Sequence, residues 1–293
     1  MTQLLVAGLV VVGLATPAYA EAFTVGLFAP SAPFPSTPSR VELASRLGEH
    51  LAKALGGTAS GRVYARAADF AAAVKRGDVT VALVDASYLA HTSGYTVLAL
   101  SVRSGDTAQG WQLIARGAKQ LADLRGKRVL VPANGGRESD FLLNVLLGGI
   151  EKDFVKVEAA PDTASALAAI SLGKADAAVV PAGVELPAGS SSLLALPAIP
   201  TPVLVSYGAL SSAQRAAVTS AAASFQGDAT VGGFRAGDAE AVRAIARRFT
   251  MPAKRGPFVV PSVRLVVGDL VENRKLAIER TPPAAFAIAP APR

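Results

Sequence analysis

Apolar and polar residues follow one another along this chain in a pattern that occurs twice. Each copy has a run with helical spacing, then a glycine, then a short apolar segment. The copies cover residues 69–85 and 165–181, with Gly77 and Gly173 at equivalent positions. An internal duplication at this separation predicts two similar α/β lobes in one chain. We expect a small molecule to bind between the lobes.

The first copy belongs to a longer run of alternating strands and helices. Between residues 41 and 55 the apolar residues recur at helical spacing, and Gly56-Gly57 then ends the run, as is typical of a helix end. Strands are predicted at residues 23–29, 62–65 and 79–84, and helices at 41–55 and 67–76. This alternation predicts a parallel sheet.

The second half of the chain repeats this order. Strands at 95–102 and 111–115 suit a crossing from one lobe to the other, and the proline-rich segment 193–206 suits an extended return. Between the crossings we predict strands at 129–131, 155–158 and 177–180, and helices at 139–147 and 163–172. Helices at 211–225 and 238–249 are expected to pack on the first lobe.

The predicted fold class is therefore α/β, with two similar lobes that have parallel-type sheets and are joined by a two-strand hinge. Residues 21–103 with 204–254 are expected to form lobe one, and residues 104–203 lobe two. From residue 255 onward the alternating pattern stops, so residues 255–293 are expected to be a C-terminal extension.

The first twenty residues predict a signal peptide and therefore export. Residues 4–15 are an apolar run, which Ala18-Tyr19-Ala20 follows with the small-x-small pattern that signal peptidase cleaves. The run is shorter than the roughly 20 residues of an ordinary membrane span. The alternatives are an uncleaved anchor and a buried first strand. Cleavage after Ala20 would place the chain in the periplasm or outside the cell.

Composition narrows the possible chemistry. The chain has 293 residues, of which 51% are hydrophobic, enough for one or two cores. It has no cysteine, which excludes disulfides and thiolate metal sites. The formal net charge of +7 favours an anionic ligand or an anionic surface, but the basic residues are scattered, so we expect no nucleic-acid partner.

Four strings of the sequence resemble the type 2 periplasmic substrate-binding proteins, in the branch that serves phosphate, phosphite and phosphonate ABC transporters. They are FTVGL at 23–27, ADFAAAVKRGDV at 68–79, LADLRGKRV at 121–129 and ALAAISLGKADA at 166–177. The resemblance covers residues 22–250. It implies the periplasmic binding protein-like II fold, no cofactor, a monomer by default and a membrane permease as a possible partner.

Ligands of open α/β sheets bind beyond the carboxyl ends of the strands, where helix N-termini present free N–H groups. In the resembling family, hydroxyl-rich turns hold the anion, and the turn at 134–139 corresponds to one of them. This turn lacks clustered hydroxyls and adds Glu138. The predicted ligand-binding residues are Ser36, Thr37, Ser87, Tyr88, Asn134, Gly135, Gly136, Arg137 and Ser139.

Each candidate group also has a structural alternative. Ser36 and Thr37 suit an ordinary helix cap, and residues 85–88 suit a capping aspartate followed by a core tyrosine. Residues 134–139 suit a flexible turn. Arg137 supplies charge if this turn contacts a ligand.

Nothing in the sequence predicts catalysis or a metal. The two histidines, His50 and His91, lack the spacing of a metal site or a triad, and the sequence contains no nucleophile-elbow or Walker A motif. We therefore predict an exported solute-binding protein that closes on a small polar or anionic ligand, a phosphate- or phosphonate-type oxyanion, for an ABC transporter. The alternative is a sensor or interaction module with the same fold, and an enzyme is a third, minor hypothesis.

Overall fold

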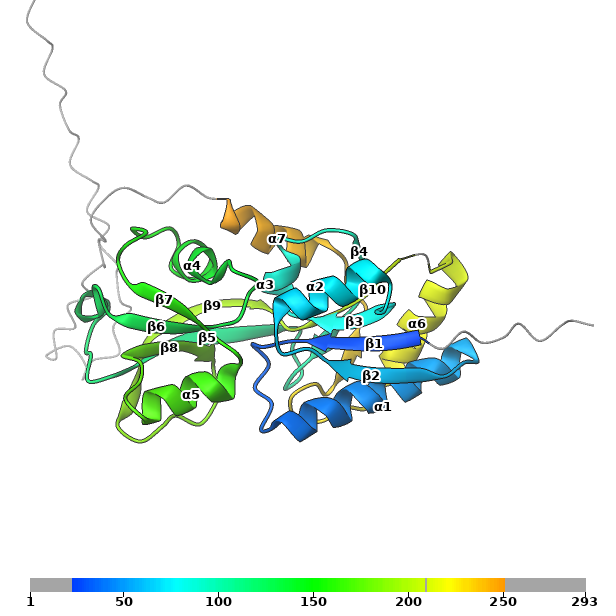
Figure 1. Cartoon of the computed structure of the whole chain (residues 1–293), viewed down its shortest axis with the longest axis horizontal. Coiled ribbons are helices and arrows are strands. Elements are labelled where there is room, and N and C mark those ends of the chain that lie inside the picture. Colours follow the sequence, from blue (N-terminus) through cyan, green and yellow to red (C-terminus); the bar gives the residue numbers. More distant parts are fainter. Residues whose placement is uncertain (1–22, 209, 251–293) are drawn as a thin grey trace, which may run out of the picture. The chain divides into compact units, whose positions relative to one another are not determined.

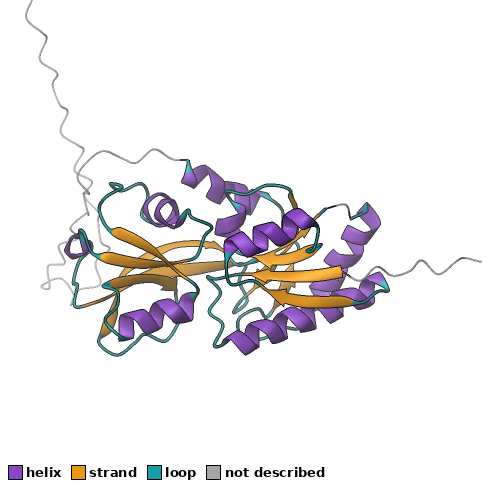
Figure 2. Cartoon of the chain, viewed as in Figure 1, coloured by secondary structure: helices purple, strands orange, loops and turns teal. Residues whose placement is uncertain are grey.

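Two mixed β-sheets, each flanked by helices, organise the chain in the computed structural model (Figures 1 and 2). The structure describes residues 23–208 and 210–250. The predicted signal peptide and C-terminal extension therefore lie outside the described residues. We call the six-stranded sheet with its helices lobe one and the five-stranded sheet with its helices lobe two. The predicted two-lobed α/β class is confirmed.

The sheet of lobe one has the strand order β11-β4-β10-β3-β1-β2. Strand β1 pairs in parallel with β2 and β3, as predicted, but β10 pairs antiparallel with β3 and β4, so the sheet is mixed. Its strands are β1 (Phe23–Phe28), β2 (Ala59–Val63), β3 (Val81–Val84), β4 (Tyr95–Val102), β10 (Val203–Tyr207) and β11 (Gly233–Arg235). All four residues of β3 are buried, as expected for a strand covered on both faces.

Apolar stripes fix the helices of lobe one on this sheet. The helices are α1 (Thr37–Leu55), α2 (Ala67–Arg76), α3 (Ala86–Leu89) and α6 (Ser212–Ser224). Helix α1 buries Leu43, Leu47 and Leu51 on one face and packs on β2 and α6. It ends at Gly56, whose φ of 67° explains the glycine there.

The sheet of lobe two has the order β7-β6-β8-β5-β9, with β6 parallel to β7 and β8, and β5 antiparallel to β8 and β9. Its strands are β5 (Ala108–Arg116), β6 (Arg128–Pro132), β7 (Lys156–Ala160), β8 (Ala177–Pro181) and β9 (Ser190–Pro200). The helices are η1 (Leu121–Leu124), α4 (Glu138–Asp140), η2 (Phe141–Leu146) and α5 (Thr163–Ser171). Both sheets therefore follow a parallel βαβ plan with antiparallel additions.

The helix predicted over residues 139–147 is present, but it is not a regular α-helix. A three-residue turn, α4, continues into the π-helical segment η2, in which the N–H of Leu147 donates to the carbonyl of Leu142 at 2.9 Å. Gly148 and Gly149 follow with positive φ and end the segment. Wider turns of this kind occur often at functional sites.

Two crossings join the lobes, as predicted. They lie side by side, because the N–H of Thr201 donates to the carbonyl of Thr107 at 3.0 Å and the N–H of Ser101 donates to the carbonyl of Pro202 at 3.0 Å. The Thr201 hydroxyl also donates to the carbonyl of Ser101. The first crossing runs from β4 to β5 and the second from β9 to β10.

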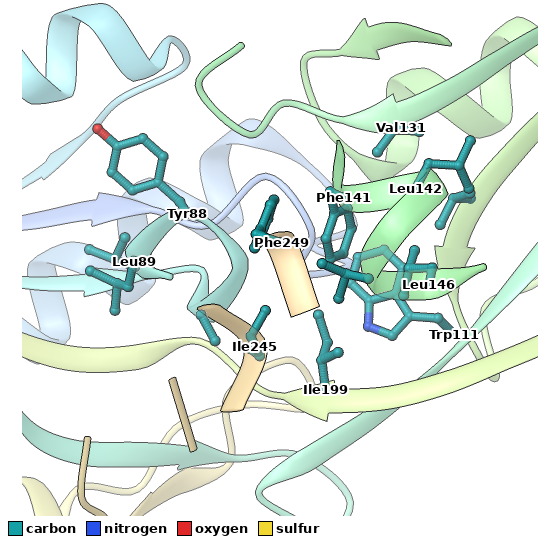
Figure 3. Packing of buried hydrophobic residues seen from close by; sticks show 14 of the residues in the cluster. Tyr88, Leu89, Trp111, Val131, Phe141, Leu142, Leu146, Ile199, Ile245 and Phe249 are labelled. Atoms are coloured by element: carbon teal, nitrogen blue, oxygen red, sulfur yellow. The ribbon is translucent and has the colours of Figure 1, made fainter. Parts of the chain in front are cut away.

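The prediction that residues 238–249 pack on lobe one is incomplete. Helix α7 (Glu240–Phe249) contacts α3 of lobe one, but also η2 and β9 of lobe two. Its last residue, Phe249, has its ring centroid 5.4 Å from that of His91 and 6.3 Å from that of Phe141 (Figure 3). Because α7 buries its apolar face against both lobes, one buried cluster continues from sheet to sheet.

The contact between α1 and β2 depends on a glycine. A Cβ at Gly61 would lie 2.3 Å from the backbone carbon of Ala44 in α1. We expect Gly61→Ala to lower the free energy of unfolding by about 1 to 3 kcal/mol, because backbone atoms of α1 must move away. Urea denaturation measures this loss.

Gly48→Ala provides the matched control, because Gly48 faces the same contact from the helix side. There the added Cβ would meet Gly61 and Ser60 at ordinary distances of 3.5 Å. Since alanine favours a helix interior over glycine by about 0.5 to 1 kcal/mol, this variant is expected to be as stable as the wild type or more stable. Equal losses in both variants would contradict the prediction.

Candidate functional site

Loops from both lobes meet beyond the carboxyl ends of β1, β3, β6 and β7. The N–H of Thr163, at the start of α5, donates to the carbonyl of Pro30 at 3.2 Å, and the Thr163 hydroxyl donates to the carbonyl of Ser31 at 3.0 Å. Residues 30 and 31 follow β1, and residue 163 follows β7. The place where open α/β sheets bind ligands is thus a direct contact between lobes.

An ion pair joins the same loops. The Arg40 guanidinium, on α1, lies 2.8 Å from the Asp162 carboxylate, with side chains 11% and 15% exposed. Asp162 also caps α5 by accepting from the N–H of Ser165 at 2.7 Å. Burial alone would raise the pKa of Asp162, but the hydrogen bonds from Ser165 and the charge of Arg40 outweigh burial and lower it.

The cavity beside this ion pair is small. It holds about 10 Å³ and is lined by residues that include Pro30, Arg40 and Pro161. This is near the smallest volume that accommodates one water, and far below the roughly 300 to 1,000 Å³ of typical ligand pockets. At this point, therefore, the lobes are in contact rather than separated by a ligand-sized space.

Asp85 holds the loop after β1 from within lobe one. Its carboxylate is 3% exposed and accepts from the N–H of Ser31 at 2.8 Å and from the Ser31 hydroxyl at 2.7 Å. Burial raises the pKa of Asp85 to about 6, although the hydrogen bonds from Ser31 and the charge of Arg40 act in the opposite direction. Asp85 is thus the anion that occupies the donors of Ser31.

Tyr88 and Gly135 bring the two predicted groups of site residues into contact. A Cβ at Gly135 would lie 2.9 Å from Cε2 of Tyr88 and 3.4 Å from Cε1 of His91, and the φ of Gly135 is 67°. Both the close approach and the left-handed backbone require glycine there. Tyr88 itself packs edge-on against Phe28, with ring centroids 4.9 Å apart. Backbone from lobe two therefore rests on aromatic rings of lobe one.

Asn134 places an unusual polar group in this contact. Its side chain is 1% exposed, and neither amide atom has a hydrogen-bond partner among the residues that the structure describes. Nε2 of His91 is also buried there without such a partner. Burial lowers the pKa of His91, and the neighbouring Asn134 amide acts in the opposite direction, so these two groups lie close to each other without a well-formed hydrogen bond. Buried amides without partners are rare and costly, which marks Asn134 as a candidate for ligand contact.

The other residues of the turn after β6 form hydrogen bonds with side chains of the same segment. Oε1 of Glu138 accepts from the N–H groups of Asn134 at 2.6 Å and of Gly136 at 3.2 Å. Arg137 donates to Asp140 at 2.5 Å and lies over the Phe249 ring, 5.8 Å from its centroid. The predicted alternative of a flexible turn does not describe this hydrogen-bonded arrangement.

The remaining predicted residues lie at the ends of helices. Ser36 caps α1 by accepting from the N–H of Ser39 at 3.3 Å, and Ser36 and Thr37 are both exposed. Ser87 is buried in α3, and Ser139 is exposed in α4. The helix-cap alternative thus describes the contacts of Ser36, while ligand contact by all four residues stays a prediction.

Sequence reasoning missed Arg40, Asp162 and Thr163. One signal was available: Asp162-Thr163-Ala164-Ser165 directly follows a strand and has the spacing of a helix cap, as is usual at such a ligand site. Arg40, the ion-pair partner of Asp162, lies more than a hundred residues away in the sequence. Nothing in the local sequence pairs the two.

The other histidine has a structural role. Nε2 of His50 donates to the carbonyl of Ala221 at 2.8 Å and so ties α1 to α6. A hollow of about 330 Å³ adjoins it, in which Arg46 already donates to the carbonyl of Gln226 at 2.7 Å.

Within residues 23–208 and 210–250, no group of three or more His, Asp or Glu side chains is placed to hold a metal ion. In the same ranges, no helix is long and apolar enough to cross a bilayer.

Comparison with known proteins identifies the class. Residues 32–251 match the family model described as ABC transporter, phosphonate, periplasmic substrate-binding protein. Because the match covers most of the chain, the chain belongs to this family, and the predicted solute-binding function is confirmed at that level.

Solved structures show the same fold. A binding-protein component of an ABC phosphonate transporter from Pseudomonas aeruginosa has a TM-score of 0.62 at 12% identity, covering 78% of this chain and 88% of that one. PhnD1 from Prochlorococcus marinus, in complex with methylphosphonate, has a TM-score of 0.62 at 12% identity, covering 77% and 96%. A Xanthomonas citri protein bound to ATP has a TM-score of 0.60 at 12% identity, covering 78% and 98%. A comparison with curated protein sequences gave no match.

The raised pKa of Asp85 predicts a pH-dependent stability. Between about pH 4 and 6 the folded protein keeps a proton on Asp85 that the unfolded chain has released, so the free energy of unfolding falls as the pH rises. The loss is about 3 kcal/mol and is complete above pH 6. Asp85→Asn lacks this titration. Urea denaturation from pH 4 to 8 should show the wild type losing about that much stability relative to the variant. A constant difference across this range would contradict the assignment.

The ion pair between lobes predicts a second stability effect. Arg40→Ala leaves the Asp162 carboxylate largely buried without its cation. We expect the free energy of unfolding to fall by about 2 to 3 kcal/mol, somewhat less than for a fully buried pair. Arg66→Ala is the control, because Arg66 pairs with Asp69 on an exposed surface, and its loss should cost less than about 1 kcal/mol. Similar losses in both variants would show that the pair between the lobes has no special role.

Proposed function

We propose that this chain is exported to the periplasm, that residues 1–20 are its cleaved signal peptide, and that it delivers a small anionic ligand to a membrane permease. The proposed ligand is a phosphorus oxyanion of the phosphate or phosphonate type. Membership of the phosphonate-binding family supports the transport role. The net charge of +7 favours an anion. We also infer that the chain acts as a monomer and without catalysis.

The observation that carries the site proposal is the buried Asn134 amide. A bound oxyanion would accept from its Nδ2 and so relieve the cost of an unpartnered donor. The adjacent Gly135 contacts Tyr88 of lobe one, and Arg137 is on the same turn. Methylphosphonate and ATP, the ligands of two similar structures, both carry phosphorus oxyanions, which supports the same ligand class here.

We propose the domain division expected from the sequence for this function, with lobe one at residues 21–103 and 204–254 and lobe two at 104–203. Opening at the two crossings would admit the ligand, and closure would bury it between the loops. The Arg40–Asp162 pair and the Thr163 hydrogen bonds would hold the closed form.

A second candidate function is a sensor or interaction module that shares the fold. The observation that favours it is the direct contact of the lobes, in which carboxylates of the chain already take backbone donors. In such a protein the closed form would be recognised by a partner without a ligand.

The experiment that separates the two starts from the complete gene, expressed with its own leader and purified from the periplasm. Mass spectrometry then tests cleavage after Ala20. A thermal-shift panel with phosphate, phosphite, methylphosphonate, sulfate and amino acids tests the ligand class. At 100 times its dissociation constant a ligand adds about 2.7 kcal/mol of stability, which raises the melting temperature clearly. A folded protein that responds to none of them would favour the second function.

We expect Asn134→Ala to change affinity and stability in different directions. Affinity for phosphate and methylphosphonate, measured by isothermal titration calorimetry, should fall by about 1 to 3 kcal/mol because a donor to the anion is lost. Stability without ligand should stay equal or rise, since the wild type buries an amide with no partner. Asn144→Ala is the control, because Asn144 is an asparagine of lobe two whose amide already has a partner, the carbonyl of Phe249. Loss of stability without loss of affinity would assign Asn134 a purely structural role.

A further inference from the structure

The turn after β6 is a pair of backbone donors occupied by a carboxylate of its own chain. The N–H groups of Asn134 and Gly136 point at one oxygen, Oε1 of Glu138, at 2.6 and 3.2 Å. Successive N–H groups that converge in this way form an anion-binding concavity. The anion in this structure is the side chain of Glu138, four residues after Asn134.

Lobe one has a related arrangement in the loop after β1. There the carboxylate of Asp85 accepts from the N–H and the hydroxyl of Ser31. Each lobe therefore supplies an internal anion to donors that lie where a ligand is expected. Backbone N–H groups that bind a carboxylate in this way need no external anion as a partner.

The side chain of Asn134 indicates that the turn is nevertheless a ligand site. It is 1% exposed, and both of its amide atoms lack a hydrogen-bond partner in the described ranges. Its backbone N–H is the one that Glu138 binds most closely. An oxyanion that accepts from the Asn134 amide therefore comes close to the Glu138 carboxylate, which is bound to the backbone N–H groups of Asn134 and Gly136. The two negative charges repel each other.

We propose that Glu138 is an intramolecular competitor of the ligand and sets the specificity of this site. This inference rests on the proposed function. Ligand binding exchanges one anion for another: the carboxylate leaves the N–H groups of Asn134 and Gly136, and the ligand oxyanion takes them. The competition lowers the affinity for simple oxyanions, and the site selects ligands that gain enough from Asn134 and its neighbours to displace Glu138.

The test uses Glu138→Ala and Glu138→Gln in the complete gene, with the protein purified from the periplasm. Inorganic phosphate and methylphosphonate are the probes, and isothermal titration calorimetry measures both affinities. Glu138→Ala frees both N–H groups and is expected to bind each anion at least tenfold more tightly than the wild type. Glu138→Gln keeps a neutral acceptor that preserves the turn, so a smaller gain is expected.

Glu151→Ala is the matched control, because it removes one carboxylate from lobe two at an exposed pair with Arg125. Its affinities should equal those of the wild type, which separates local competition from a change in net charge. Tighter binding by Glu151→Ala to the same degree would overturn the proposal.

The outcomes distinguish this proposal from the proposed function. If the wild type binds phosphate and neither Glu138 variant binds more tightly, the competitor role is wrong and the proposed function stands. If the wild type binds neither anion but the Glu138 variants do, the competitor role stands and the proposed ligand class of the wild type is wrong. If no form binds either anion, both proposals are wrong.

Discussion

Burial of apolar side chains from both sheets in one cluster is the interaction on which the arrangement of the two lobes depends. The cluster includes Phe28 and Phe70 in lobe one and Trp111 and Phe141 in lobe two. Figure 3 shows Phe249 between Tyr88 of lobe one and Phe141 of lobe two. Each large side chain buried in this way contributes about 1.5 to 3 kcal/mol. Because this cluster is shared, the two lobes of the described chain pack directly against each other.

The shared cluster imposes a constraint on every polar group at its edge. Groups that leave water must find partners within the protein, or they cost free energy. Asp85, Asp162 and Glu138 each meet this constraint by accepting from backbone N–H groups, and Arg40 neutralises Asp162. Asn134 does not meet it within the described chain. The Asn134 amide is therefore the feature on which the proposed site depends.

This distribution of donors and acceptors bears on what a phosphonate-family fold does in this chain. A hydroxyl-rich turn leaves its N–H groups free for an oxyanion, whereas the turn at 134–139 carries its own carboxylate. In the role that we propose for Glu138, this one side chain sets how readily the turn accepts an anion. Solved structures that are 12% identical to this chain share its fold, and a shared fold does not by itself decide the ligand.

The sequence by itself determined the alternation of strands and helices, the duplication and the two crossings. Apolar spacing carries that information locally, and the run of residues from Ala67 to Arg76, for instance, forms helix α2 with the bounds predicted for it. Tyr88, Asn134 and Gly135 were also identified as candidates, because residues that follow buried strands lie at a predictable edge of a sheet.

Only the tertiary structure decided the contacts across the lobes. The ion pair of Arg40 with Asp162 and the position of Phe249 between the lobes join residues more than a hundred positions apart. Hydrophobic periodicity shows which face of a helix is buried but not which other element covers that face. For this reason the sequence predicts α7 on lobe one alone. The role of Glu138 depends in the same way on the folded turn, because backbone N–H groups converge on a carboxylate only after the chain has taken its conformation.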